Sequence, residues 1–268
     1  MLKHLHGNGI EIAYRIDGDR SPYRPWLVFS HSLACDHTMW NPQIDAFKRA
    51  CNVLCYDTRG HGGTSAPAGD YTLDLLVDDL RALLDALHID HCHFVGLSLG
   101  GMIGQVAALR MPMRIASLTL ADTSSRTPPE MKPVWAERVA SVKGAAAVGA
   151  VAAATLERWF TPGYRIAHAD VIKHIEGLIR ATPVNGYVGC AHAIAGLNLT
   201  HRLQDIRCPV LVIVGAEDPG TPPAMAETIV QAVEHARYQK IANAAHLSNI
   251  EQPEAFNAAL RDFLTALD

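Results

Sequence analysis

The stretch Gly96-Leu97-Ser98-Leu99-Gly100 decides the fold, because it joins the apolar run at 93–95 to a helical run at 101–109. A serine between two glycines at a strand-to-helix turn has the pattern of a nucleophile elbow. Such a turn forces strained backbone angles on the serine, and glycines relieve the crowding beside it. The hydroxyl of Ser98 is then exposed at a helix N-terminus, where the dipole favours developing negative charge. Ser98 is therefore the candidate nucleophile.

A serine hydroxyl needs a base and an orienting acid, and the chain supplies both in the order Ser, Asp, His. The run 209–215 predicts a buried strand, and Asp218 follows it. The run 237–241 predicts the next strand, and His246 lies in the loop after it. Both side chains then lie at the carboxyl ends of strands, the sheet edge where Ser98 also lies. This chain order singles out His246 among fourteen histidines.

Other polar residues near strand ends compete for these roles. Asp122 ends the apolar run that starts at Leu118 and is a rival acid to Asp218, which remains favoured. The turn around Asp57, Arg59 and His61 has a catalytic composition, but its charged groups and glycines are typical of a braced sharp loop. We interpret that turn as structural.

An oxyanion hole requires two backbone amides that point at the developing oxyanion. The residue after the nucleophile, Leu99, supplies one amide. The loop after the predicted strand at 26–30 supplies the other, and we assign it to Leu33. His31, just before Ser32 in this loop, fits a bracing role better than that of a second base.

Composition limits the remaining possibilities. The 268 residues are 49% hydrophobic and 19% charged, which predicts a folded chain with a sizeable core. The net charge of −4 and the lack of a basic run argue against a nucleic-acid partner. The N-terminus lacks an apolar signal segment, and no stretch is long enough to span a membrane. No cofactor or metal is expected, since the six cysteines show no metal-ligand spacing, and a reducing cytoplasm is the simplest setting.

Short apolar runs alternate with amphipathic helices, which predicts an α/β fold with a mainly parallel, twisted sheet flanked by helices. Leucines and a valine at three- and four-residue intervals predict a helix over 73–87. Strand patterns stop between about 124 and 203, where three helical stretches are expected at 133–142, 144–160 and 170–181. We expect a core of residues 1–123 and 204–268, with 124–203 as a helical cap over the active-site edge.

The elbow, acid, histidine and helical block together resemble the α/β-hydrolases over nearly the whole chain. Narrower motifs resemble the 3-oxoadipate enol-lactonases; they are His31-Ser32-Leu33, Met39-Trp40, Pro42-Gln43, 56–62, Gly100-Gly101-Met102, 156–162, Ala245-His246-Leu247-Ser248-Asn249 and Glu251-Gln252-Pro253. The resemblance assigns the triad to Ser98, Asp218 and His246. Asp122 departs from it, since asparagine is more usual there. Ser32, where glycine is usual, and Ala34-Cys35 are further departures.

The substrate implied by this resemblance is a small lactone that carries a free carboxylate. Such a charge is costly to bury unless it is paired. Trp135 and Arg138 lie three residues apart and share a helix face, while Arg158 and Trp159 follow in the next helical stretch. We expect Trp135 to wall the pocket and Arg138 to bind the carboxylate, since a guanidinium fork matches a planar anion. The structural alternative is that Arg138 is a solvated charge on the helix surface and Trp135 belongs to the core.

Three other functions remain open. A carboxylesterase of broader specificity and a cofactorless C–C bond hydrolase use the same triad. A non-catalytic ligand receptor on the hydrolase fold is the alternative outside enzymes. A haloalkane dehalogenase is disfavoured, because its elbow nucleophile is a carboxylate, whereas this elbow carries Ser98.

Overall fold

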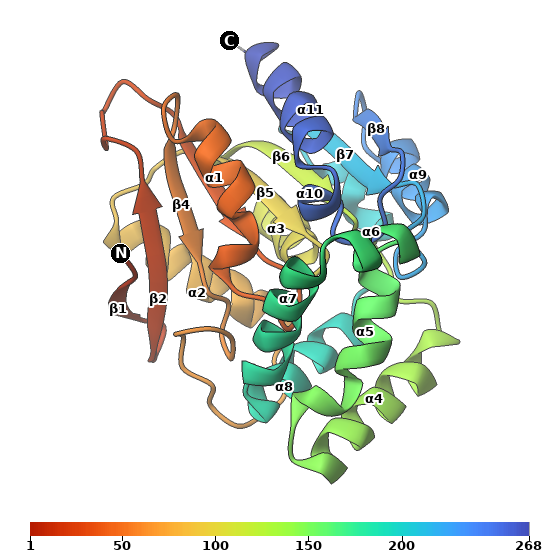
Figure 1. Cartoon of the computed structure of the whole chain (residues 1–268). Helices are drawn as coiled ribbons and strands as arrows, with labels where there is room; N and C mark the ends of the chain where they lie inside the picture. The colour runs from red at the N-terminus through yellow and green to blue at the C-terminus, as the bar shows by residue number, and fades with distance from the viewer. Residues whose placement is uncertain (268) are drawn as a thin grey trace.

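A computed structural model describes residues 1–267, which contain an eight-stranded sheet in the order β1-β2-β4-β3-β5-β6-β7-β8 (Figure 1). β1 pairs with β2 and β2 with β4 in antiparallel fashion, and the pairs from β4 to β8 are parallel. The strands are β1 (Lys3–Gly7), β2 (Ile10–Asp17), β3 (Trp26–Ser30), β4 (Asn52–Tyr56), β5 (Cys92–Leu97), β6 (Ile115–Ala121), β7 (Val210–Gly215) and β8 (Arg237–Ile241). The predicted α/β-hydrolase sheet is confirmed.

Helices cover both faces of the sheet. α3 packs on β3, β5 and β6 and also contacts α2, while α11 packs on β7 and β8 and contacts α1. The helices and 3₁₀ turns outside the β6–β7 connection are η1 (His37–Trp40), α1 (Asn41–Phe47), α2 (Leu73–Ala86), α3 (Leu99–Arg110), α9 (Pro223–Ala232), α10 (Ser248–Glu251) and α11 (Pro253–Thr265). The helix expected at 73–87 is present as α2.

The connection from β6 to β7 is helical, and Figure 1 shows its green helices gathered on one side of the molecule. We call the segment from α4 to α8 the helical insertion. Its elements are α4 (Met131–Ala145), η2 (Val148–Val151), α5 (Ala152–Trp159), α6 (Pro162–Ala167), α7 (Ala169–Ala181) and α8 (Val184–Ala195), and η3 (Thr200–Asp205) follows before β7.

One expectation about this segment is wrong. Residues 144–160 do not form a continuous helical stretch, because α4 ends where Ala146 adopts a left-handed φ of 50°. The amides of Ala146 and Ala147 then bond the carbonyls of Lys143 and Val142, which closes the helix end. Helix α8, absent from the sequence-based prediction, is mostly apolar and buried at eight of its 12 residues, with Asn185 and His192 exposed, so its amphipathic pattern is weak.

The helical insertion is joined closely to the core. A Cβ added to Gly60, in the turn after β4, would lie 2.2 Å from the Cα of Gly186 in α8. The backbone amide of Tyr71 also donates to the carbonyl of Gly189. No helix within residues 1–267 is long and apolar enough to cross a membrane.

Candidate active site

Ser98 lies at the turn between β5 and α3 with φ 55° and ψ −112°, a region that non-glycine residues rarely adopt. Its amide donates to the carbonyl of Ala121 at 2.9 Å, and its carbonyl accepts from the Thr123 hydroxyl at 2.7 Å. These bonds hold the strained backbone from both sides, as an elbow requires.

The glycines around Ser98 are needed for close approach. A Cβ on Gly96 would lie 2.2 Å from the Gly100 carbonyl oxygen, and one on Gly100 would lie 2.1 Å from the Ser30 carbonyl oxygen. Because Ser30 ends β3, the elbow and the loop that follows β3 lie against each other. That loop carries Leu33, which lines the same cavity as Ser98. Leu99 is the first residue of α3, and amides in the first turn of a helix have no intrahelical partner.

Asp218 and His246 come together beyond the ends of β7 and β8. The Nδ1–H of His246 donates to Asp218 Oδ2 at 2.8 Å. The same carboxylate accepts from the Gly220 and Thr221 amides at 2.7 and 3.1 Å, and from the Thr221 hydroxyl at 2.6 Å. Sequence reasoning missed Thr221, although an aspartate followed by Pro-Gly-Thr is typical of a side-chain-capped turn.

Electrostatics suit this pair to hold a proton on the imidazole. Burial alone would raise the pKa of Asp218, but the His246 charge and the donated hydrogen bonds outweigh it and hold the pKa below its usual range. Burial would likewise lower the pKa of His246, but the Asp218 carboxylate raises it. With Nδ1 bonded to Asp218, the ring nitrogen left to accept a proton is Nε2, and His246 lines the cavity beside Ser98.

The rival acid Asp122 has different partners. Its Oδ1 accepts from the Gly215 amide at 2.7 Å, and the Ser248 hydroxyl contacts its Oδ2. Asp218, and not Asp122, is therefore the acid that bonds His246.

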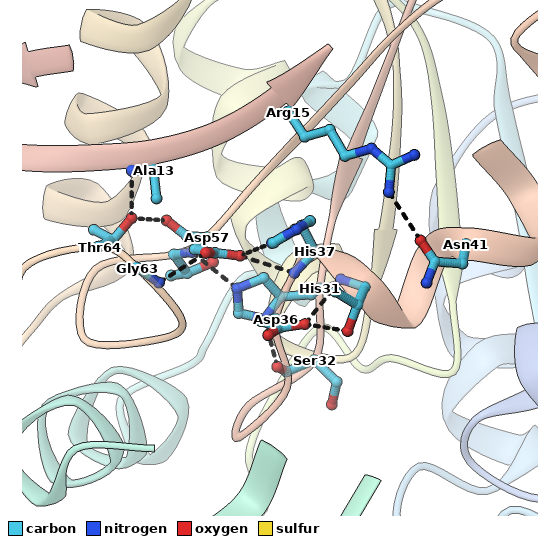
Figure 2. A network of polar contacts seen from close by, with 12 residues as sticks. Ala13, Arg15, His31, Ser32, Asp36, His37, Asn41, Asp57, Gly63 and Thr64 are labelled. Atoms are coloured by element: carbon cyan, nitrogen blue, oxygen red, sulfur yellow. Dashed lines mark hydrogen bonds and ion pairs between the residues drawn. The ribbon is translucent and has the colours of Figure 1, made fainter. Parts of the chain in front are cut away.

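Figure 2 shows the polar network around the loop after β3. His31 Nε2 accepts from the Thr58 amide at 2.8 Å, so its Nδ1 carries the hydrogen and donates to the Ser32 carbonyl at 2.7 Å. Burial lowers the pKa of His31, which keeps the ring neutral. Beside it, the amide and Nδ1 of His37 both donate to Asp57 Oδ1 at 2.8 Å. His31 thus braces the loop that presents Leu33.

The turn after β4 is structural in its contacts. The guanidinium of Arg59 forms a buried two-point contact with Asp79, and His61 Nδ1 approaches the Arg59 carbonyl at 3.2 Å. Burial lowers the pKa of His61 to about 3, so the ring is neutral. The described lining of the cavity includes Ser98 and His246 but none of these residues.

A cavity of about 920 Å³, measured with its open mouth, lies between the core and the helical insertion. The core contributes Ser98, His246 and Leu33 to the wall, together with Thr221. The insertion contributes Trp135, Arg138, Thr155, Arg158, Trp159 and Tyr187.

The insertion side of this cavity is cationic. Arg138 lies over the ring of Trp135 at 4.8 Å, and Arg158 donates to the Thr155 hydroxyl at 3.2 Å. Burial, and then the charge of Arg138, lower the pKa of Arg158, and both arginines line the cavity. A third arginine, Arg126, also lines the cavity, and no aspartate or glutamate is among the described lining residues. This wall is therefore suited to an anionic ligand.

Sequence reasoning also missed Glu251, which connects the histidine loop to the insertion. Its buried carboxylate accepts from the amides of Ala245 and Thr161 at 2.8 and 2.9 Å. The amide of Leu247 donates to the carbonyl of Trp159, whose ring stacks 6.2 Å from that of His246. The only sequence signal for Glu251 was its place in the motif Glu251-Gln252-Pro253, which resembles the enol-lactonases.

Comparisons with known proteins agree with this architecture. The family model described as "alpha/beta hydrolase fold" matches residues 25–253. A 3-oxoadipate enol-lactonase of Acinetobacter baylyi is 37% identical over 237 residues, 88% of this chain and 87% of the relative. A relative from Caulobacter sp. (strain K31), named for carbamate hydrolysis, is 28% identical and matched over 95% of this chain and 96% of its own.

The solved structures include the crystal structure of the enol-lactonase from Burkholderia xenovorans LB400. It superimposes with a TM-score of 0.94 at 39% identity, over 98% of this chain and all of the other. The family model and the identity to these relatives extend over most of the sequence, including the elbow and both strand ends that carry the acid and the histidine. The chain belongs to the α/β-hydrolase family.

Proposed function

We propose that this chain is a serine hydrolase that opens a small anionic lactone, with 3-oxoadipate enol-lactone as substrate and 3-oxoadipate as product. One observation carries the proposal. The strained serine and the Asp218-bonded histidine line one cavity, and the opposite wall carries the guanidinium groups of Arg138 and Arg158 without an acidic partner in the described lining. The lactonase names of two relatives support this choice of substrate.

In the proposed reaction, His246 Nε2 removes the hydroxyl proton of Ser98 as Oγ attacks the lactone carbonyl carbon. The oxyanion accepts hydrogen bonds from the amides of Leu33 and Leu99. Collapse of this intermediate breaks the ring C–O bond. The released enolate takes the proton from His246 and remains part of the acyl-enzyme, because ring and acyl group belong to one molecule.

Deacylation repeats these steps with water. His246 takes a proton from water, whose oxygen attacks the acyl carbon, and Ser98 leaves with the proton returned from the imidazolium. Asp218 stays ionised throughout and holds the imidazole in the tautomer with the hydrogen on Nδ1. The product is a dicarboxylate, since the new carboxylate joins the one already present.

The substrate's free carboxylate is proposed to bind between Arg138 and Arg158, with Trp135 as the adjacent wall. Two guanidinium groups near each other repel, and an anion between them removes this cost and adds charge-assisted hydrogen bonds. Arg158 extends the sequence-based assignment, which named Trp135 and Arg138.

Two organisational features belong to the same proposal. Residues 1–123 and 204–268 act as the catalytic core, and 124–203 act as a cap that supplies the carboxylate site. We also propose a cytoplasmic setting, because Cys35, Cys55 and Cys92 are thiols packed in the hydrophobic core.

The experiment compares three substrates of one enzyme preparation. Enol-lactone generated in situ from muconolactone is followed spectrophotometrically, beside a neutral p-nitrophenyl ester and a neutral carbamate. We expect turnover of the lactone to exceed that of both neutral compounds. A higher kcat/KM for the neutral ester identifies a broad carboxylesterase instead, and a higher value for the carbamate identifies a carbamate hydrolase.

Labelling by a fluorophosphonate probe separates catalysis from binding alone. We expect wild-type protein to be labelled and Ser98→Ala protein to remain unlabelled. Folded wild-type protein that resists the probe contradicts the serine-hydrolase proposal and favours a ligand receptor.

A further inference from the structure

A second buried carboxyl group, that of Asp122, bonds residues close in sequence to Asp218 and His246 and has no part in the reaction described above. Asp122 follows β6 with a left-handed φ of 43°, and its amide donates to the Ile213 carbonyl at 2.9 Å. Its Oδ1 accepts from the Gly215 amide at 2.7 Å, and its Oδ2 bonds the hydroxyl of Ser248. Its side chain is fully buried. The carboxyl group therefore joins the ends of β6 and β7 to the start of α10.

These partners are placed next to the proposed acid and base. Gly215 is the last residue of β7 and precedes Asp218 by three positions, while Ser248 follows His246 by two. The backbone between Gly215 and Asp218 is a tight turn, closed by the Asp218 amide on the Gly215 carbonyl at 3.2 Å. A shift at either contact of Asp122 is thus transmitted to Asp218 or His246 through only two or three residues.

The hydrogen bonds around the two carboxyl groups differ in a way that decides which one is charged. Asp218 accepts four donated hydrogen bonds, from two amides, the Thr221 hydroxyl and His246 Nδ1. Asp122 accepts one bond from an amide, and its other partner is the Ser248 hydroxyl, which accepts as readily as it donates. Two anions in one dry site repel, so the less solvated group keeps its proton.

We propose that Asp122 is a positioning residue held as a neutral carboxylic acid, which ties the loops of Asp218 and His246 together without adding a second anion beside the imidazole. In this state the Oδ2 hydroxyl of Asp122 donates to Ser248 Oγ. The role assigned to His246 rests on the proposed function, whereas the protonation state of Asp122 does not.

The electrostatic surroundings support this state. Burial, and then the charge of Asp218, raise the pKa of Asp122 to about 8. The titratable groups that act on Asp122 are Asp218, from the loop after β7, and His246, from the loop after β8; protonated His246 opposes the rise. Arg158 of α5 acts on His246 from the cavity side.

The first test measures the proton directly, without any substrate. In infrared spectra at pH 6.5, wild-type protein is expected to show the carbonyl stretch of a buried carboxylic acid that is absent from Asp122→Asn protein. Asparagine is the matched replacement, because it has the same shape and can accept from Gly215 and donate to Ser248. Identical spectra in this region would overturn the neutral-acid assignment.

The second test follows stability against pH. Since Asp122 is protonated in the folded state and ionised in the unfolded state between pH 4 and 8, folding takes up a proton at this group, and its contribution to wild-type stability falls across this range. Asp122→Asn removes this loss, so its Tm minus the wild-type Tm should increase by several degrees from pH 4.5 to 8. A difference that stays constant with pH contradicts the proposal.

The third test concerns positioning. Asp122→Ala removes both contacts and is expected to lower kcat about 10- to 100-fold with a small change in KM, because a small misplacement of acid and base has that cost. Asp122→Asn should restore most of the lost kcat. If Asp122→Ala does not fold, the infrared and Tm results still decide the protonation state. Equal kcat for the alanine and asparagine variants overturns the positioning role. Failure of the fluorophosphonate probe to label Ser98 in wild-type protein overturns only the proposed function.

Discussion

The two walls of the cavity are built on opposite principles. On the core side, Asp218 accepts four hydrogen bonds, and the backbone of Ser98 is fixed by Ala121 at the end of β6 and by Thr123 just after it. On the insertion side, Arg138 lies against the aromatic face of Trp135, and Arg158 donates to one hydroxyl, that of Thr155. The core groups are satisfied without a ligand, but the arginines are not. Chemistry is preorganised by the fold, while recognition is completed by the substrate.

The largest expected effect tests the core wall. Ser98→Ala should lower kcat by on the order of a millionfold, since removing the nucleophile disables the whole triad. Binding of the dicarboxylate product, measured by calorimetry, should remain within a few-fold, because Arg138 and Arg158 are untouched. Appreciable lactone hydrolysis by the variant would show that the strained serine is not the nucleophile.

The next effect concerns the orienting acid. Asp218→Asn should lower kcat about 10⁴-fold, because the amide no longer holds the imidazole with its hydrogen on Nδ1. Asp122→Asn is the matched control, as it makes the same change in a buried carboxyl group that His246 does not contact. The kcat of both variants is measured by steady-state kinetics at pH 7. Equal losses of kcat would contradict the assignment of Asp218 as the orienting acid.

Substitutions in the insertion wall should affect an anionic substrate more than a neutral one. Arg138→Gln and Arg158→Gln are each expected to lower kcat/KM for the anionic lactone about 10- to 100-fold, the value of a charge-assisted hydrogen bond. Hydrolysis of a neutral p-nitrophenyl ester should change little. Arg81→Gln, a change on the exposed surface of α2, serves as control. Parallel losses on both substrates would mean that the arginines support the fold and not recognition.

The pH dependence also distinguishes the walls. His246 must be neutral to accept the serine proton, and Asp218 raises its pKa above 6.5. kcat/KM should therefore fall about tenfold per pH unit below a midpoint above pH 6.5. The arginines remain charged across this range, so product affinity should not follow the same curve. A midpoint well below 6.5 would mean that burial outweighs the Asp218 charge.

The core wall was more predictable from the sequence than the insertion wall. Ser98, Asp218 and His246 were proposed from glycine spacing and from their places after apolar runs, because backbone geometry restricts which residues fit there. The sequence alone could not decide whether Asp218 or Asp122 bonds His246, since both aspartates follow strands; the structure was needed for this. The place of Arg158 beside Arg138 in the cavity lining also required the structure, because it depends on how the helices of the insertion are arranged.

The helices of the insertion were predicted least well, because their ends and packing depend on tertiary contacts and not on a local sequence pattern. Residues 144–154 consist of alanine, glycine and valine only, so no periodic apolar face shows where α4 ends at Ala145 and η2 begins. Helix α8 is mostly buried and contacts the turn at Gly60 through Gly186, a tertiary contact without a local sequence signal.

The smallest expected effect lies where the core wall meets the cavity. The Thr221 hydroxyl donates to Asp218 Oδ2 at 2.6 Å and lies 3.3 Å from His246 Nδ1, so it shares the carboxylate oxygen with the imidazole. Thr221→Val removes one of four donors, and we expect kcat to fall about three- to tenfold. The carboxylate becomes a stronger base, so the pKa of His246 and the acid midpoint of kcat/KM should rise. Thr221→Ser keeps the hydroxyl and should match wild type in both quantities. If the valine variant keeps the wild-type kcat and midpoint, Thr221 only fills space, and the preorganisation of Asp218 does not depend on its hydroxyl.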